Sequence, residues 1–212
     1  MYKTILFDFD GTVFDTGEGV MKCVQYAARA FGFQADDMRQ LRRFVGPPLL
    51  ETLKKQYGVD DATARAMLAK YRERYSDTGV NECSPYPGVA ELASELRASG
   101  LKVAVATGKP TVYTKQILAA HGMENTFDEV LGSEFDGTRS QKWEVIAELL
   151  KTFGAEGAVM VGDRDNDVIG AKKCGLPCIG VAWGFAEPGE LKNAGAICVV
   201  ENTEELKNIL LG

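Results

Sequence analysis

Apolar residues follow two different spacings along the chain, and the change between them divides the sequence into parts. An apolar run at residues 5–9 is rich in strand-forming residues. From residue 17 to about residue 80 the apolar positions repeat at helical spacing, and no convincing strand interrupts them. Beyond residue 85, short apolar strands alternate with helical segments; the strands are expected at 101–106, 129–131, 158–161, 177–181 and 196–200.

Helices are expected in both parts of the chain. In the first part they cover 17–31, 48–57 and a stretch from Asp61 to about Tyr75; in the second part they cover 89–99, 111–121, 141–153, 168–173 and 204–210. Alternating strands and helices favour a parallel sheet that is covered by helices on both faces. The predicted fold class is α/β, a Rossmann-like doubly wound parallel sheet with an inserted α-helical cap domain. We expect residues 1–15 and 85–212 to form the core and 16–84 the cap.

Composition narrows the possible partners. The chain has 212 residues and a formal net charge of −6, which argues against a nucleic-acid backbone or an anionic membrane as the main partner. Five cysteines without a C-x-x-C pair and a single histidine fit neither a disulfide framework nor a zinc site. No apolar run approaches the roughly 18 residues of a membrane span, and the N-terminus has no leader pattern. We therefore expect a cytoplasmic protein, a monomer or a homodimer.

The run D-F-D-G-T carries the first candidate chemistry. Asp8 and Asp10 stand at the C-terminal end of the first predicted strand, and Gly11 bends the chain directly after them. Ligands of open α/β sheets bind at this edge of the sheet. Two carboxylates placed there repel each other and lose hydration unless a cation lies between them. The sequence therefore predicts a cation site at this strand end.

Two later strands end in similar chemistry. Thr107 and Gly108 follow the strand at 101–106 and precede a helix, so a hydroxyl and backbone N–H groups form a candidate anion site. The strand at 158–161 is followed by Asp163, and Asp167 comes one helical turn later. A parallel sheet brings its strand ends to one edge, so these residues are expected close to Asp8.

These motifs, in this order, resemble those of the haloacid dehalogenase superfamily, most of whose members are magnesium-dependent phosphohydrolases. The resemblance implies that Asp8 is the nucleophile, that Asp10 is the general acid/base, and that the Thr107 hydroxyl binds phosphate. It also implies that Mg²⁺ is held by Asp8, the backbone carbonyl of Asp10 and Asp163. Asp167 would hold a metal-bound water or orient a lysine.

The resemblance further calls for a lysine between the second and fourth motifs. Lys142 lies near the start of a helix that Ser140 would cap, and its ammonium would neutralise the phosphate and the nucleophile. Family members often have proline after this lysine, whereas Trp143 follows it here. Lys109 is therefore kept as the alternative catalytic lysine.

Further residues are assigned to substrate binding. They are two residues of the first motif and two of the second, and a pair of cap arginines near the loop at 44–48: Gly11, Thr12, Gly108, Lys109, Arg42 and Arg43. The G-P-P-L segment and the GDR-x-x-D motif resemble phosphoglycolate phosphatase-like and 5′-nucleotidase-like members. The predicted function is Mg²⁺-dependent hydrolysis of a phosphomonoester through an aspartyl-phosphate. The substrate would be a small phosphorylated metabolite: phosphoglycolate, a nucleoside monophosphate or a sugar phosphate.

Alternative functions remain open at this point. A β-phosphoglucomutase-like phosphotransferase would keep all four motifs, but mutases carry a histidine in the first cap helix and residues 17–31 contain none. A non-catalytic protein that binds phosphorylated ligands would use the same fold. A dehalogenase would use Asp8 but would have no use for Asp10, Asp163 and Mg²⁺.

Overall fold

A six-stranded parallel sheet forms the centre of the computed structural model, which describes residues 1–212. Its strands are β1 (Thr4–Phe7), β4 (Lys102–Pro110), β5 (Glu129–Ser133), β6 (Ala158–Gly162), β7 (Cys178–Val181) and β8 (Cys198–Val200). Their order across the sheet is β5-β4-β1-β6-β7-β8. In this register Leu6 lies between Ala104 of β4 and Met160 of β6. Because β1 is central, its C-terminal end lies where ligands of doubly wound sheets bind.

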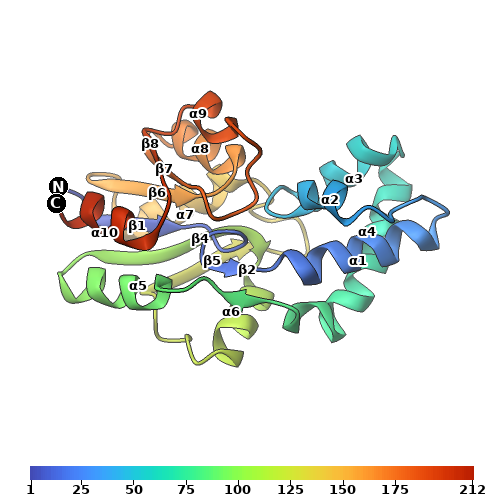
Figure 1. The fold of residues 1–212 in the computed structure, drawn as a ribbon, viewed down its shortest axis with the longest axis horizontal. Helices are drawn as coiled ribbons and strands as arrows, with labels where there is room; N and C mark the ends of the chain where they lie inside the picture. Colours follow the sequence, from blue (N-terminus) through green and yellow to red (C-terminus); the bar gives the residue numbers. More distant parts are fainter.

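Helices cover both faces of the sheet (Figure 1). Ile5 and Phe7 of β1 belong to one buried cluster and Leu6 to a second, since successive side chains of a strand point to opposite faces. The first cluster includes apolar residues of α5 (Val89–Ala98), α6 (Thr111–Ala120) and α10 (Thr203–Leu211). The second includes residues of α7 (Lys142–Phe153), α8 (Asp165–Lys173) and α9 (Glu190–Ala194). The predicted α/β fold class is confirmed.

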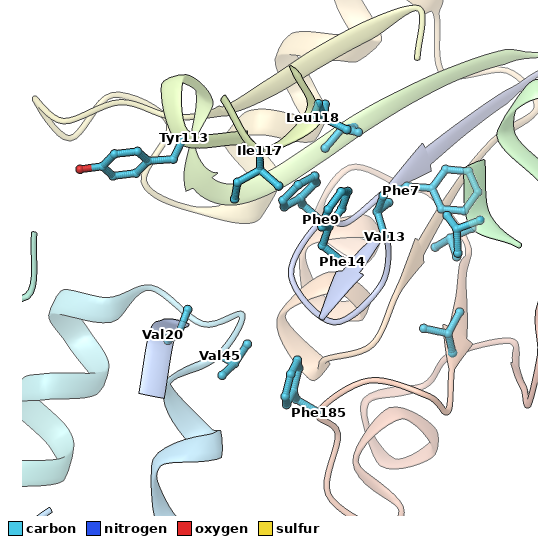
Figure 2. Packing of buried hydrophobic residues seen from close by; sticks show 14 of the residues in the cluster. Phe7, Phe9, Val13, Phe14, Val20, Val45, Tyr113, Ile117, Leu118 and Phe185 are labelled. Carbon is cyan, nitrogen blue, oxygen red and sulfur yellow. The ribbon is translucent and has the colours of Figure 1, made fainter. Parts of the chain in front are cut away.

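Aromatic packing supports the loop that follows β1. The rings of Phe9 and Phe14 stack with 4.9 Å between their centroids. Figure 2 shows these two rings side by side, next to Ile117 and Leu118 of α6. All four side chains are almost completely buried. The chain that carries Asp8 and Asp10 is thus anchored by apolar side chains on both sides of the acids.

The helical stretch after this loop lies beyond one end of the sheet (Figure 1). It contains α1 (Gly17–Ala30), α2 (Met38–Leu41), α3 (Leu49–Tyr57), α4 (Asp61–Asp77) and the 3₁₀ turns η1 (Arg42–Phe44) and η2 (Gly79–Asn81). A two-stranded antiparallel sheet of β2 (Phe14–Asp15) and β3 (Ser84–Pro85) joins its ends. The division into a core and a cap at residues 15–16 and 84–85 stays a prediction, and β2 pairs with β3 at those positions.

Polar contacts connect the loop after η1 with the rest of the chain. The Arg164 guanidinium donates to the Val45 carbonyl at 2.8 Å. The Arg42 guanidinium donates to the Gly184 carbonyl at 3.3 Å and lies 5.0 Å from the centre of the Phe185 ring. Both contacts bring the helical stretch against residues that follow the strand ends β6 and β7. None of the helices combines the length and the apolar character that crossing a membrane requires.

Several local predictions are corrected. The N-cap of α7 is Gln141, not Ser140, because Gln141 and Glu144 form a reciprocal capping box. Pro110 ends β4 and directly precedes α6. The pattern also missed β2, β3, α2 and α9, which have two to five residues each. Elements this short show too few repeats for a period to be recognised.

Candidate active site

Lys142 contacts two acids at the C-terminal edge of the sheet. Its ammonium lies 2.6 Å from Oδ1 of Asp8 and 2.8 Å from Oδ1 of Asp167, and it donates to the Ala106 carbonyl at 3.1 Å. All three charged residues are buried. The second carboxylate oxygen of Asp8, Oδ2, is buried without a hydrogen-bond partner. Asp8 therefore has one oxygen fixed by the lysine and one that is free to react.

Asp8, Asp163 and Asp167 form a buried acid cluster, in which one carboxylate oxygen of each residue lies within 4.8 Å of the others. Three carboxylates and the single Lys142 ammonium leave two negative charges uncompensated. Burial and the negative charge of Asp167 raise the pKa of Asp8 to about 7. Burial together with the same neighbouring acid raises the pKa of Asp163 well above its usual value. A divalent cation would neutralise this cluster.

The charges of the cluster also stabilise its lysine. Burial lowers the pKa of Lys142, but the carboxylates of Asp167 and Asp8 outweigh burial and hold this pKa above its ordinary value. Lys142 is therefore a permanent cation at neutral pH.

Residues of the first motif and of the segment after β7 hold the Asp163 carboxylate in place. The Thr12 hydroxyl donates to Asp163 Oδ1 at 3.1 Å, and the Phe185 amide donates to Oδ2 at 2.8 Å. A Cβ atom added at Gly11 would lie 2.1 Å from Oδ2 of Asp163, and one added at Gly184 would lie 2.4 Å from it. The two glycines are required because the backbone approaches this carboxylate too closely for a side chain.

Asp10 lies outside the acid cluster and has partners of its own. The Lys109 ammonium donates to its two oxygens at 2.8 and 3.1 Å, and the Thr16 hydroxyl donates to Oδ1 at 2.6 Å. Thr16 occupies the N-cap position of α1, but its hydroxyl donates to this acid and makes no hydrogen bond to the helix. The two candidate lysines thus have different partners: Lys142 contacts Asp8, and Lys109 contacts Asp10.

The second motif lies beside these acids, at the end of β4. Thr107 is buried, and its hydroxyl accepts a hydrogen bond from the Lys109 amide at 3.2 Å. The Gly108 carbonyl accepts from the Ser133 hydroxyl at 2.7 Å, which ties this turn to β5. The three predicted strand-end motifs and Lys142 of α7 therefore meet at one edge of the sheet.

A cavity of about 350 Å³ extends from Asp10 and Lys109 to α4. Neither Arg42 nor Arg43 lines it, so this cavity does not support their assignment to substrate binding, which stays a prediction. Arg42 is engaged with Gly184, and Arg43 is exposed and donates to Gln56. The cationic side chains of the cap that line the cavity are Arg65 and Arg72 of α4. The sequence did not distinguish them, since charged residues on a helix usually face solvent.

Comparisons with known proteins agree with this geometry. Residues 5–181 match the family model described as haloacid dehalogenase-like hydrolase. A 5′-nucleotidase of Pseudomonas aeruginosa is 41% identical over 90% of this chain and 87% of its own length. A phosphoglycolate phosphatase of Vibrio cholerae is 28% identical over 99% of this chain and 97% of its own length.

One further relative and one solved structure are similar to this chain. The tyrosine-protein kinase PtkA of Mycobacterium tuberculosis is 34% identical over 86% of this chain, which spans 63% of that relative. The crystal structure of a predicted phosphatase from Clostridium acetobutylicum superposes with a TM-score of 0.96 at 41% identity, covering 100% of this chain and 99% of that one. The chain therefore belongs to the haloacid dehalogenase-like hydrolase family. Within that family it is a phosphatase, and its substrate carries a phosphoryl group.

Proposed function

We propose that the protein is a Mg²⁺-dependent phosphomonoester hydrolase that forms an aspartyl-phosphate on Asp8. The observation that carries this proposal is the buried, unpartnered Oδ2 of Asp8 within a cluster of three carboxylates and one lysine. A buried carboxylate oxygen without a partner is costly unless the site uses it. Here that oxygen is available as a nucleophile.

The donor set of the cluster fits Mg²⁺. Hard cations of this kind prefer oxygen ligands, and the cluster offers carboxylates with two negative charges left uncompensated. Asp8, Asp163 and the backbone carbonyl of Asp10 would hold the ion, and Asp167 would orient Lys142, which it contacts at 2.8 Å. The bound ion supplies positive charge that offsets the repulsion between Asp8 and a phosphate.

The protein's own residues would then carry the two chemical steps. Asp8 Oδ2 attacks phosphorus while Lys142 and the Thr107 hydroxyl stabilise the phosphoryl oxygens. Asp10 protonates the leaving alkoxide and then removes a proton from the water that hydrolyses the aspartyl-phosphate. Lys109 and Thr16 hold the Asp10 carboxylate in place for both transfers.

The names of two relatives indicate candidate substrates for this protein. These relatives are named after the hydrolysis of a 5′-nucleotide and of phosphoglycolate, and both compounds are small phosphomonoesters. A sugar phosphate is the third candidate. The mutase alternative has less support, because α1 (Gly17–Ala30) contains no histidine.

Phosphate release from a panel of phosphomonoesters tests this proposal. The wild-type protein and Asp8→Asn would be assayed with Mg²⁺ and with EDTA. The matched control is Asp77→Asn, which changes an exposed acid at the end of α4. We expect release by the wild type and the control with Mg²⁺ only, and none by Asp8→Asn. Equal release in EDTA would contradict the role of the metal, and an active Asp8→Asn would contradict the nucleophile.

A further inference from the structure

The cavity beside Asp10 lies where a leaving group must lie. Asp10 and Lys109 line one end of it, and residues of α4 and of the segment after β5 line the remainder. If Asp10 protonates the leaving oxygen, the group attached to that oxygen extends away from Asp8 into this space. The walls of the cavity therefore select the substrate.

Aromatic side chains from both parts of the chain meet at this cavity. The rings of Tyr75 and Tyr113 have centroids 5.1 Å apart, and those of Tyr113 and Phe135 are 5.3 Å apart, both in edge-to-face contact. Figure 2 shows the Tyr113 side chain directed away from Ile117, although both residues belong to the buried apolar cluster. Phe135 is 48% exposed although it is a large apolar residue. An exposed ring at the wall of a cavity offers a face on which a planar group can stack.

The size of the cavity exceeds what a two-carbon leaving group needs. Its volume of about 350 Å³ falls within the roughly 300–1,000 Å³ of sites that enclose larger organic ligands. A glycolate group would leave most of this space to water.

Two of the three cationic side chains that line the cavity already have an acid partner, and Arg72 is the third. The Lys109 ammonium is paired with Asp10, and Arg65 is paired with Asp61. Arg72 lies with its guanidinium 4.8 Å from the centre of the Phe135 ring. Two further residues of the lining, Glu134 and Asp136, are acids; Glu134 is paired with Arg139, and no ion pair is formed by Asp136. Carboxylates repel a carboxylate but accept hydrogen bonds from sugar hydroxyls.

A buried hydroxyl completes the cavity wall. Tyr75 is 1% exposed, lines the cavity, and its hydroxyl has no hydrogen-bond partner. The Lys109 ammonium lies 4.9 Å from the centre of its ring. A buried hydroxyl normally has a hydrogen-bond partner, so a polar atom of a bound ligand would supply the partner that the Tyr75 hydroxyl lacks.

We propose, on the basis of the phosphatase function proposed above, that this cavity binds the nucleoside part of a nucleoside 5′-monophosphate. The base stacks on the wall that Phe135 and Tyr113 form. The Tyr75 hydroxyl and the acids Glu134 and Asp136 bind the polar groups of the nucleoside.

A matched set of substrates tests this assignment, with kcat/KM as the readout. Adenosine 5′-monophosphate and ribose 5-phosphate share the phosphorylated sugar and differ in the base, and phosphoglycolate is the small anionic alternative. Since a base that stacks on aromatic rings strengthens binding, we expect the nucleotide to be preferred over ribose 5-phosphate by about tenfold or more. The preference over phosphoglycolate should be at least as large.

A variant separates the stacking contact from a structural effect. Phe135→Leu removes an exposed ring, so we expect kcat/KM for the nucleotide to fall by about fivefold or more while the value for ribose 5-phosphate is unchanged. The control is Phe31→Leu, an exposed phenylalanine after α1 that does not line the cavity; both values should stay the same.

The outcomes distinguish this inference from the proposed function. Preferred hydrolysis of phosphoglycolate or ribose 5-phosphate, or an equal loss for both substrates in Phe135→Leu, would overturn the nucleoside assignment and leave the phosphatase intact. If no ester is hydrolysed by the folded, Mg²⁺-loaded protein, the proposed function fails and the inference fails with it.

Discussion

The acid cluster makes a quantitative prediction about the stability of the metal-free protein. Burial and the neighbouring acid raise the pKa of Asp8 from 3.8 to about 7. Since one pKa unit corresponds to about 1.4 kcal/mol, ionised Asp8 destabilises the metal-free fold by ~4 kcal/mol. The variant Asp8→Asn removes this charge and keeps the shape of the side chain. We expect it to be more stable than the wild type in EDTA at pH 8.

The sign of the pH dependence follows from linkage. A carboxyl whose folded pKa is raised binds more protons in the folded state between pH 3.8 and about 7. The stability of the wild type therefore falls as pH rises through this window, and the full penalty is present above about pH 7. The difference in unfolding free energy between Asp8→Asn and the wild type should grow from near zero at pH 4 to ~4 kcal/mol at pH 8.

Urea unfolding at pH 5 and pH 8, in EDTA and in Mg²⁺, measures this difference. Mg²⁺ should stabilise the wild type more than Asp8→Asn, because the ion neutralises the charge that the variant lacks. The exposed-acid control, Asp77→Asn, should stay within about 0.5 kcal/mol of the wild type at both pH values. A less stable Asp8→Asn at pH 8 in EDTA would refute the reasoning, since Asp8 would then be stabilised by its surroundings.

Three further substitutions test individual contacts by urea unfolding and steady-state kinetics. Lys142→Met should cost about 3–5 kcal/mol and abolish phosphate release, since it leaves buried acids unpaired; the exposed Lys115→Met should do neither, and a fully stable Lys142→Met would contradict the pairing. Tyr75→Phe should raise stability by about 1 kcal/mol and lower kcat/KM, because its hydroxyl is buried without a partner; a loss of stability would argue against this. Arg164→Ala should cost about 1.5–3 kcal/mol and raise KM, since it removes the hydrogen bond to Val45; an unchanged KM would show that this contact does not position the cap.

The sequence predicted the sheet and the meeting of its motifs because both depend on regular patterns. Strand ends of a parallel sheet lie at one edge, so Asp8, Thr107 and Asp163 had to lie near each other once the strands were recognised. No such rule predicts which of the two lysines, Lys109 or Lys142, contacts Asp8. The choice depends on side-chain directions at the end of β4 and at the start of α7, and the structure places Lys142 on Asp8 and Lys109 on Asp10.

The cap was less predictable than the core. Its helical character follows from apolar spacing, but the residues that face the cavity depend on how α4 packs against the core. Arg42 and Arg43 were chosen for their place beside a Pro-Gly loop, whereas Arg72 and Tyr75 line the cavity. Neither residue belongs to a recognisable local motif. Tyr75 lies on the apolar face of its helix and is buried, so nothing in the sequence indicated that it also lines the cavity.

The most direct test of the account is chemical trapping of the phosphoenzyme. The wild-type protein would be mixed with Mg²⁺ and substrate, quenched in acid within the first turnover, and reduced with borohydride, which converts an acyl phosphate to an alcohol. Mass spectrometry of the peptide that contains residues 4–22 would then locate the modified residue. We expect homoserine at position 8 in the wild type. Rapid phosphate release without any modification of Asp8, or with modification of another acid, would contradict the central claim.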